Sequence, residues 1–271
     1  MDALIRSIDS GPGGLLPAQR RQRIVEFLKS HGAVTLPQLE QALAVSLSTL
    51  RRDLDSLASD GVVERTHGGA LLRQQGYSTF EPDVVSASEL SPAEKRAIGI
   101  AAAASLEPHQ SVIFDSGTTV LEAARAVAAR ALPLTAVTND LAIAQILGAV
   151  PGMQVHVLGG QLRPGFSTLM GHSVTEAAAA ISADVLLCGA HAICDGLLSE
   201  TSAEVAAVKR AFVRAARVRR LLVDASKFRA AAFMRVVSLS EFSDVLTDDA
   251  ITEADAERVR SLGVPLIAVS R

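Results

Sequence analysis

The sequence predicts an α/β domain with a mostly parallel sheet, preceded by a small domain of three helices and two strands. Residues 18–73 hold three short helical patterns followed by two short strand patterns. In residues 91–271, continuous apolar runs alternate with helical patterns, which is typical of parallel strands that are buried on both faces. Between these parts, the mixed polar stretch 74–90 is interpreted as a linker, and residues 1–17 as a flexible N-terminal tail.

The small domain is expected to be a winged helix-turn-helix. Apolar residues at helical spacing predict three helices, which begin near Arg20, Thr35 and Ser46. Thr35 and Ser46 are each expected to cap the helix that follows. Two strands complete the pattern, over residues 62–66 and 70–73, joined by a tight turn at 67–69.

The second domain is expected to open with a capping box at residues 91–94, with Pro92 at the first helical position. Strands are predicted over residues 111–115, 134–138, 154–158, 184–189, 220–224, 244–247 and 265–269. Helices are predicted between them, ending near residues 130 and 147 and spanning 173–181, 204–218 and 252–262. In folds of this kind, ligands bind at the carboxyl ends of the strands.

Composition excludes several classes of protein. Apolar residues make up 49% and charged residues 20%, a globular balance that excludes disorder throughout. Aromatic residues make up only 3%, which argues against an aromatic platform for carbohydrate or single-stranded nucleic acid. The two cysteines exclude a disulfide framework, and no apolar run is long enough for a membrane helix or a signal peptide. We therefore expect a soluble cytoplasmic protein with no cofactor, metal or membrane partner.

The predicted third helix carries side chains that suit DNA. Its first turn holds three hydroxyl groups, those of Ser46, Ser48 and Thr49. Hydroxyls and free amide groups at a helix N-terminus suit phosphate oxygens. Arg51 and Arg52 follow, and arginines at this position of a helix-turn-helix can bond guanine edges in the major groove. The alternative is a solvated face, on which Asp53 and Asp55 balance the two arginines.

Residues 115–119 form a candidate ligand loop, because they lie where a predicted strand ends and a helix begins. They are Asp115, Ser116, Gly117, Thr118 and Thr119. The glycine allows close backbone approach, and the helix N-terminus supplies amide groups and a positive dipole that suit a phosphate. The alternative is that the hydroxyl side chains merely cap the helix.

Three further loops follow predicted strands in the same way. They contain Asn139, the pair Gly159 and Gly160, and Lys227, a cation that suits an anionic ligand. Each also has a simpler interpretation, with Asn139 as a helix cap, the glycines as a turn and Lys227 as solvated surface.

The small domain resembles the DNA-binding motif of the DeoR family of bacterial transcriptional regulators. The residues that carry the resemblance are Arg20, Ile24, Leu28, Ser46 and 49–54, together with the second hallmark at 65–70. The resemblance implies that Ser48, Thr49, Arg51 and Arg52 contact DNA. It also implies a backbone contact from Arg65 or His67, although His67 could instead shape the turn.

The resemblance extends to the second domain and covers nearly all of residues 18–269. The matching positions are 95–98, 115–119, Thr138, Asn139, 158–160, Gly171, Glu204, Lys209 and 224–228. They imply a sensor domain that is similar in fold to ribose-5-phosphate isomerase and coenzyme A transferases, with a phosphorylated sugar or related metabolite as effector. The segment 189–196 and Arg229 depart from the family pattern.

Together the two domains predict a repressor of a carbohydrate-catabolism operon, which binds double-stranded operator DNA and is released by a phosphorylated sugar. Each chain has one predicted DNA-binding domain, and a single domain of this size buries little DNA surface. A homo-oligomer is therefore expected, either a dimer or a tetramer. The alternative is a sugar-phosphate isomerase-like enzyme that carries a winged-helix interaction module. Its acid and base candidates are Asp115, Asp184, Asp195, Glu204 and Lys227. No catalytic residue is predicted.

Overall fold

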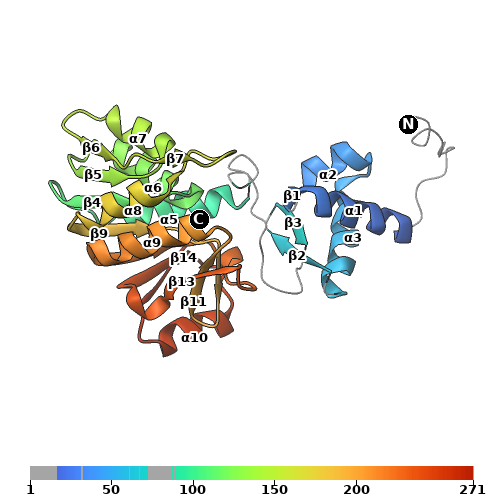
Figure 1. Cartoon of the computed structure of the whole chain (residues 1–271). Coiled ribbons are helices and arrows are strands. Elements are labelled where there is room, and N and C mark those ends of the chain that lie inside the picture. Colours follow the sequence, from blue (N-terminus) through green and yellow to red (C-terminus); the bar gives the residue numbers. More distant parts are fainter. Residues whose placement is uncertain are drawn as a thin grey trace. The chain divides into compact units, whose positions relative to one another are not determined.

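A computed structural model describes residues 17–31, 33–60, 62–66, 68–72, 87 and 90–270 (Figure 1). Contacts divide the chain into two units, residues 1–73 and 74–271, which we call the N-terminal unit and the C-terminal unit. The predicted tail, apart from Pro17, lies outside the described residues. So do His67 and the predicted linker, apart from Ala87 and Leu90.

The N-terminal unit is a winged helix-turn-helix, as predicted. Its elements are α1 (Pro17–His31), β1 (Ala33–Thr35), α2 (Leu36–Leu43), α3 (Leu47–Ser59), β2 (Val63–Thr66) and β3 (Gly69–Leu72). Ile24, Leu39 and Leu54 bring the three helices together in one buried cluster. Strand β1 was not predicted, because three residues are too few to show an alternating pattern. It pairs antiparallel with β3, which gives the sheet order β1-β3-β2.

The two predicted helix caps of this unit have different outcomes. Thr35 forms a capping box, because its hydroxyl accepts from the amide of Gln38 and the Gln38 side chain accepts from the Thr35 amide at 2.8 Å. Ser46 stands at the N-cap of α3, but the prediction that its side chain caps the helix is wrong. Its hydroxyl instead lies within hydrogen-bonding distance of the hydroxyls of Ser48 and Thr49.

The C-terminal unit is built on a seven-stranded parallel sheet of order β15-β14-β12-β9-β4-β5-β6. Its strands are β4 (Ser111–Phe114), β5 (Thr135–Thr138), β6 (Gln154–Val157), β9 (Ala183–Cys188), β12 (Ala216–Leu222), β14 (Asp244–Asp248) and β15 (Leu266–Val269). Its helices are α5 (Pro92–Ala104), α6 (Thr118–Ala129), α7 (Leu141–Gly148), α8 (His172–Ala179), α9 (Ala203–Ala215) and α10 (Glu253–Ser261). The predicted fold class is thus confirmed.

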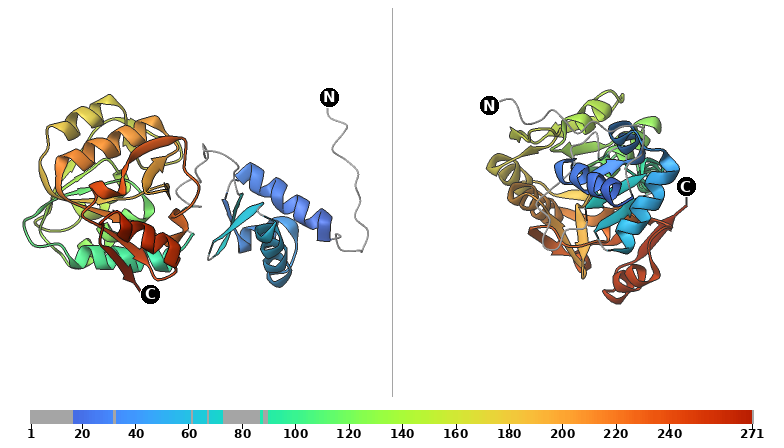
Figure 2. Two further views of the ribbon diagram at one scale, coloured as in Figure 1. Left: turned by 90° about the horizontal axis from the view of Figure 1, so that it is seen from below. Right: turned by 90° about the vertical axis from the view of Figure 1, so that its right-hand side faces the viewer.

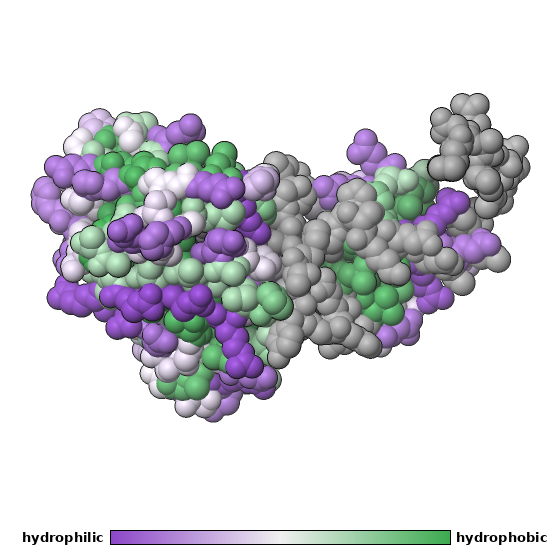
Figure 3. All heavy atoms as spheres, viewed as in Figure 1, coloured by the Kyte–Doolittle hydropathy of each residue, from purple (hydrophilic) through white to green (hydrophobic). Residues whose placement is uncertain are grey.

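Helices lie on both faces of this sheet (Figures 1 and 2). Successive side chains of a strand point to opposite faces, so Val185 and Leu187 of β9 join the cluster under α5, α6 and α7. Leu186, between them, joins the cluster under α8 and α9. Burial on both faces explains why the strands are continuous apolar runs. In the view of Figure 3, hydrophilic and apolar side chains are interspersed over the surface of this unit.

The structure corrects one helix cap and one helix end that were predicted in the second domain. The capping box predicted at residues 91–94 is wrong, because Ser91 has a φ of 51° and its side chain does not cap α5. Pro92 does take the first helical position. The helix predicted to run to residue 218 ends at Ala215, because the chain from Ala216 onward pairs in register with β9.

Sequence reasoning also missed two small sheets of the C-terminal unit. One is antiparallel and contains β10 (Ala192–Cys194), β11 (Leu197–Glu200) and β13 (Met234–Ser238). The other is the hairpin of β7 (Gln161–Leu162) and β8 (Leu169–Met170). Two short 3₁₀ helices lie at Ala225–Lys227 and Leu239–Glu241. Among the described residues, no helix combines the length and the apolar character that crossing a membrane requires.

Candidate functional site

Helix α3 presents two adjacent arginines on its exposed face. Arg51 and Arg52 are both exposed, whereas Leu50 and Leu54 on the opposite face are fully buried against the other helices. The spacing of four residues between the leucines places them on one face, so the arginine side chains are left to solvent. The core of the unit therefore fixes the direction in which this pair of cations points.

The two carboxylates that follow these arginines are bound to other residues. Asp53 is buried and forms an ion pair with Arg20 of α1, in which Asp53 Oδ1 accepts from Arg20 Nη2 at 3.0 Å. Asp55 lies 3.1 Å from Arg65 Nε of β2. Both acidic side chains thus have cationic partners outside the Arg51–Arg52 pair, which weakens the alternative that they balance it.

The other DNA-contact candidates lie around the N-terminus of α3 and on the adjacent hairpin. Ser46 and Ser48 are exposed, and Thr49 is half-buried. The hydroxyl of Ser46 lies within hydrogen-bonding distance of the other two hydroxyls and does not cap the first amide groups of the helix. Arg65 is half-buried beside Asp55, and His67 lies outside the described residues.

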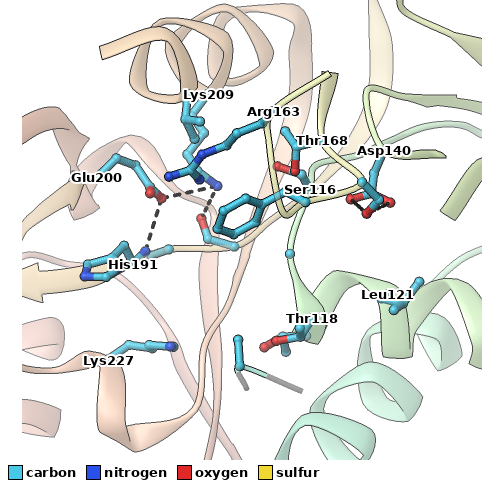
Figure 4. A pocket seen from close by; sticks show the side chains of 18 of the residues that line it. Ser116, Thr118, Leu121, Asp140, Arg163, Thr168, His191, Glu200, Lys209 and Lys227 are labelled. Carbon is cyan, nitrogen blue, oxygen red and sulfur yellow. Dashed lines mark hydrogen bonds and ion pairs between the residues drawn. The ribbon is translucent and has the colours of Figure 1, made fainter. Parts of the chain in front are cut away.

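A pocket lies at the carboxyl edge of the parallel sheet in the C-terminal unit. The chain runs from β4 outward to β5 and β6, then returns to β9 on the other side of β4. The loops after β4 and β9 therefore diverge at a topological switch point, where α/β folds bind ligands. The pocket is lined by residues 116–119, 166–168 and 189–191, and by Ala87, Leu121, Asp140, Arg163, Glu200, Val205, Lys209, Lys227 and Arg229 (Figure 4).

The loop before α6 forms one wall of this pocket. Gly117 has a φ of 135°, a conformation that favours glycine, and no atom lies within 4 Å of the position where a Cβ would stand. Gly117 is the N-cap of α6 and has no side chain to cap the helix, and it lines the pocket together with Ser116, Thr118 and Thr119. Amide groups at a helix N-terminus carry a positive potential that suits an anion.

Asp115 lies behind the pocket rather than on its wall. It is 1% exposed, and its Oδ2 accepts from Lys209 Nζ and, at 3.0 Å, from the Gly189 amide. Its other oxygen, Oδ1, has no hydrogen-bond partner among the described residues, so a direct contact between Asp115 and a ligand stays a prediction. Through Oδ2, Asp115 also holds Lys209, which lines the pocket.

Lys209 and Glu200 were not predicted as site residues. Lys209 Nζ lies 3.4 Å from Glu200 Oε1 and donates to the Gly189 carbonyl at 2.9 Å. Burial disfavours the ammonium charge, but Asp115 and Glu200 outweigh it and raise the pKa of Lys209 above its ordinary value. Lys209 is one of the positions that carry the resemblance to the sensor domain, which was the available signal, but its place in a helix gave no indication that it would be buried beside two carboxylates.

Several cations surround His191 at the opposite wall. Arg229 Nη2 donates to the His191 carbonyl at 2.9 Å and lies 3.1 Å from its Nε2. The Cζ atom of Arg163 lies 4.0 Å from the centroid of the Phe166 ring. The side chain of Lys227 points into the pocket (Figure 4). Burial first, then the charges of Arg229 and Lys227, lower the pKa of His191 well below its usual range. The imidazole is therefore neutral near pH 7.

Asn139 and Gly160 position the hairpin that carries Arg163 rather than lining the pocket. Asn139 is buried and donates from Nδ2 to the Leu169 carbonyl at 2.8 Å. A Cβ at Gly160 would lie 2.6 Å from the Met170 carbonyl oxygen, so only glycine allows the hairpin to pack this closely. Gly159 accepts a hydrogen bond from Ser173. Of the sequence candidates, residues 116–119 and Lys227 line the pocket.

Two family models match the chain. The model described as DeoR-like helix-turn-helix domain matches residues 20–76, and the DeoR C terminal sensor domain matches residues 91–249. The HTH-type transcriptional repressor GlcR of Bacillus subtilis strain 168 is 30% identical over 255 residues, which are 93% of this chain and 96% of GlcR. The glycerol-3-phosphate regulon repressor of Escherichia coli K12 is 30% identical over 231 residues, which are 85% of this chain and 90% of that protein.

Solved structures give a more distant likeness. Ribose 5-phosphate isomerase A from Methanocaldococcus jannaschii is 13% identical, with a TM-score of 0.37, and the match covers 49% of this chain and 53% of the isomerase. A likeness at this level carries no argument about activity.

Proposed function

The chain belongs to the DeoR family of transcriptional regulators, and on this premise we propose that it represses a carbohydrate-catabolism operon and releases its operator when a phosphorylated sugar binds. The observation that carries the proposal is the pairing of two features on one chain. One unit presents exposed arginines on a recognition helix, and the other contains a cation-lined pocket over a helix N-terminus. The alternative of an isomerase-like enzyme is not favoured, because the relatives are named as regulators.

For DNA, the proposal assigns base contacts to Arg51 and Arg52 and phosphate contacts to Ser46, Ser48 and Thr49. Arginine can bond the O6 and N7 atoms of guanine bidentately, and the amide groups at the start of α3 suit a phosphate. Arg65 and His67 are proposed to contact the backbone of the duplex.

For the effector, the proposal assigns the phosphate to residues 116–119 and Lys227. The amide groups of α6 and a lysine at the facing loop supply donors and positive charge from two sides. Glu200 and neutral His191 also line the pocket and are suited to sugar hydroxyls. Asp115 and Asn139 support these groups from behind, and Gly159 and Gly160 shape the adjacent turn.

We further propose that the operator-binding species is a homodimer or a homotetramer. One winged helix contacts a single half-site, and a module of this size buries too little surface for tight specific binding on its own. Sedimentation that shows a monomer at micromolar concentration, with undiminished operator affinity, would contradict this.

The test of the whole proposal is operator binding in the presence of phosphorylated and unphosphorylated sugars. Operator DNA is selected from a random library, and its affinity for the full chain is measured with ribose 5-phosphate, glucose 6-phosphate and the matching free sugars. We expect at least one sugar phosphate to weaken operator binding by about 5- to 150-fold, the range of typical allosteric coupling, while its free sugar has little effect.

Lys227→Ala provides the matched variant. It should bind the operator like the parent protein but no longer release it when the sugar phosphate is added. Arg125→Ala, which removes an exposed cation of α6 outside the pocket, should respond like the parent. A normal response of Lys227→Ala would place the effector elsewhere.

A further inference from the structure

Lys95 binds the end of the segment that leads into the C-terminal unit. It lies in the first turns of α5 and is 2% exposed. Its ammonium donates to the carbonyls of Ala87 and Leu90, each at 2.6 Å. Both acceptors are neutral backbone groups, so the lysine holds the chain just before α5 by charge-assisted hydrogen bonds.

The charges around Lys95 connect it to the pocket. Burial first, then repulsion from Lys227, lower the pKa of Lys95 to about 8, while Asp224, Glu94 and Glu122 favour its charged form. These groups come from α5 itself, from α6 and from the loop after β12. Of them, Lys227 lines the pocket.

Ala87 is a second connection, because it belongs to the pocket wall and its carbonyl is one of the two acceptors of Lys95. The chain passes through Ala87 and Leu90 on its way from the N-terminal unit to α5. A molecule in the pocket therefore faces the residue at which the connecting chain is held.

We propose that Lys95 is a positioning residue that couples occupancy of the pocket to the connecting chain, an inference that rests on the proposed function. An anion beside Lys227 offsets the repulsion between the two lysines and so favours the charged form of Lys95. The charged form holds the carbonyls of Ala87 and Leu90, so occupancy tightens this attachment. By linkage, loss of the charge on Lys95 weakens binding of the anion.

The first experiment measures hydrogen exchange of the full chain in a peptide that spans Ala87–Leu90. Lys95→Met should lower the protection of this peptide at least tenfold and leave the α9 peptide unchanged. Arg96→Met, which removes an exposed neighbouring cation, should have no effect. In the parent protein, protection should fall between pH 7 and pH 9, whereas Lys95→Arg should show no such dependence because arginine stays charged.

If Lys95→Met does not fold, the pH series on the parent protein decides alone. Protection that is independent of pH in the parent would then overturn the proposal. If the variant folds, unchanged protection in Lys95→Met would overturn it as well.

The second experiment measures coupling. The probes are ribose 5-phosphate and glucose 6-phosphate. The affinity of Lys95→Met for the active sugar phosphate should be within about tenfold of that of the parent. Adding this sugar phosphate should nevertheless change the operator affinity of Lys95→Met less than twofold. A parent-like loss of operator affinity would overturn the role of Lys95. If the parent responds to neither probe, the proposed effector is in error. The attachment is then tested separately by adding inorganic phosphate, which should raise the protection of the Ala87–Leu90 peptide.

Discussion

Asp115 and Lys209 form a buried ion pair across the pocket edge although they lie 94 positions apart in the sequence. Asp115 follows β4, an interior strand of the sheet, and Lys209 comes from α9 on one face of the sheet. Glu200 shares the same ammonium at 3.4 Å. The pair fastens the helix to the loop that forms the pocket wall, so it sets the shape of the site without itself exposing Asp115.

Lys209→Met should be strongly destabilising. It leaves Asp115 and Glu200 close together without their cation, and breaking a buried ion pair costs about 3–5 kcal/mol. Chemical denaturation of the C-terminal unit measures this loss. Arg214→Met removes an exposed cation from the same helix and should change the free energy of unfolding by less than about 0.5 kcal/mol. Equal stability of the two variants would show that the Asp115–Lys209 pair contributes nothing.

Asp53→Asn should destabilise the N-terminal unit more than Asp55→Asn does. Asp53 is buried and bonded to Arg20, so its loss leaves a largely buried guanidinium with a weakened partner, at a cost of about 1–3 kcal/mol. Asp55 is exposed, and its contact with Arg65 is worth at most about 1 kcal/mol. Calorimetry of the full chain resolves the two variants, and the reverse order would contradict the burial argument.

Arg51→Ala and Arg52→Ala should each weaken operator binding by about 1–3 kcal/mol and relax the preference at one base position, if the side chain contacts a base. A contact with phosphate alone would instead weaken all sequences alike and reduce the salt slope by about one unit. Binding isotherms at several salt concentrations distinguish these results. Native affinity and slope in both variants would refute the assignment of α3 as the recognition helix.

The sequence predicted the large elements because they carry strong periodic signals. Buried strands such as β9 are continuous apolar runs, and α3 repeats leucines at helical spacing. It missed the small antiparallel sheet, in which β11 pairs with β13 from a distant part of the chain, so that the pairing of Glu200 with Met234 is not visible in the local pattern. Helix α9 was extended too far, because the pairing of β12 with β9 begins at Ala216, where the local pattern still favours helix.

The site was predictable only where a loop directly follows a strand. Residues 116–119 and Lys227 were found in this way, and both line the pocket. Glu200 and Lys209 depend on contacts between distant segments, which spacing in the sequence does not encode. Arg163 likewise reaches the pocket only because its hairpin folds back onto the loop at Asn139.

The last prediction concerns acid stability and His191. Burial and the adjacent Arg229 and Lys227 lower the pKa of His191 well below its usual range, so the folded protein keeps this imidazole neutral. Below the ordinary value of 6.5 the unfolded chain binds a proton that the folded chain does not. The free energy of unfolding should therefore fall as the pH drops below 6.5, by about 1.4 kcal/mol for each pH unit from this residue alone.

His191→Gln tests this, because glutamine offers an oxygen that can still accept from Arg229 and has no proton to gain. Denaturant unfolding of the parent and the variant is measured between pH 7.5 and pH 4.5. The stability of the parent relative to the variant should be constant above pH 6.5 and should decrease steadily below it. His156→Gln, on the exposed edge strand β6, serves as the control and should follow the parent throughout. If the curves of His191→Gln and the parent stay parallel down to pH 4.5, His191 takes up its proton in the folded state, and the cationic surroundings inferred for this pocket would be wrong.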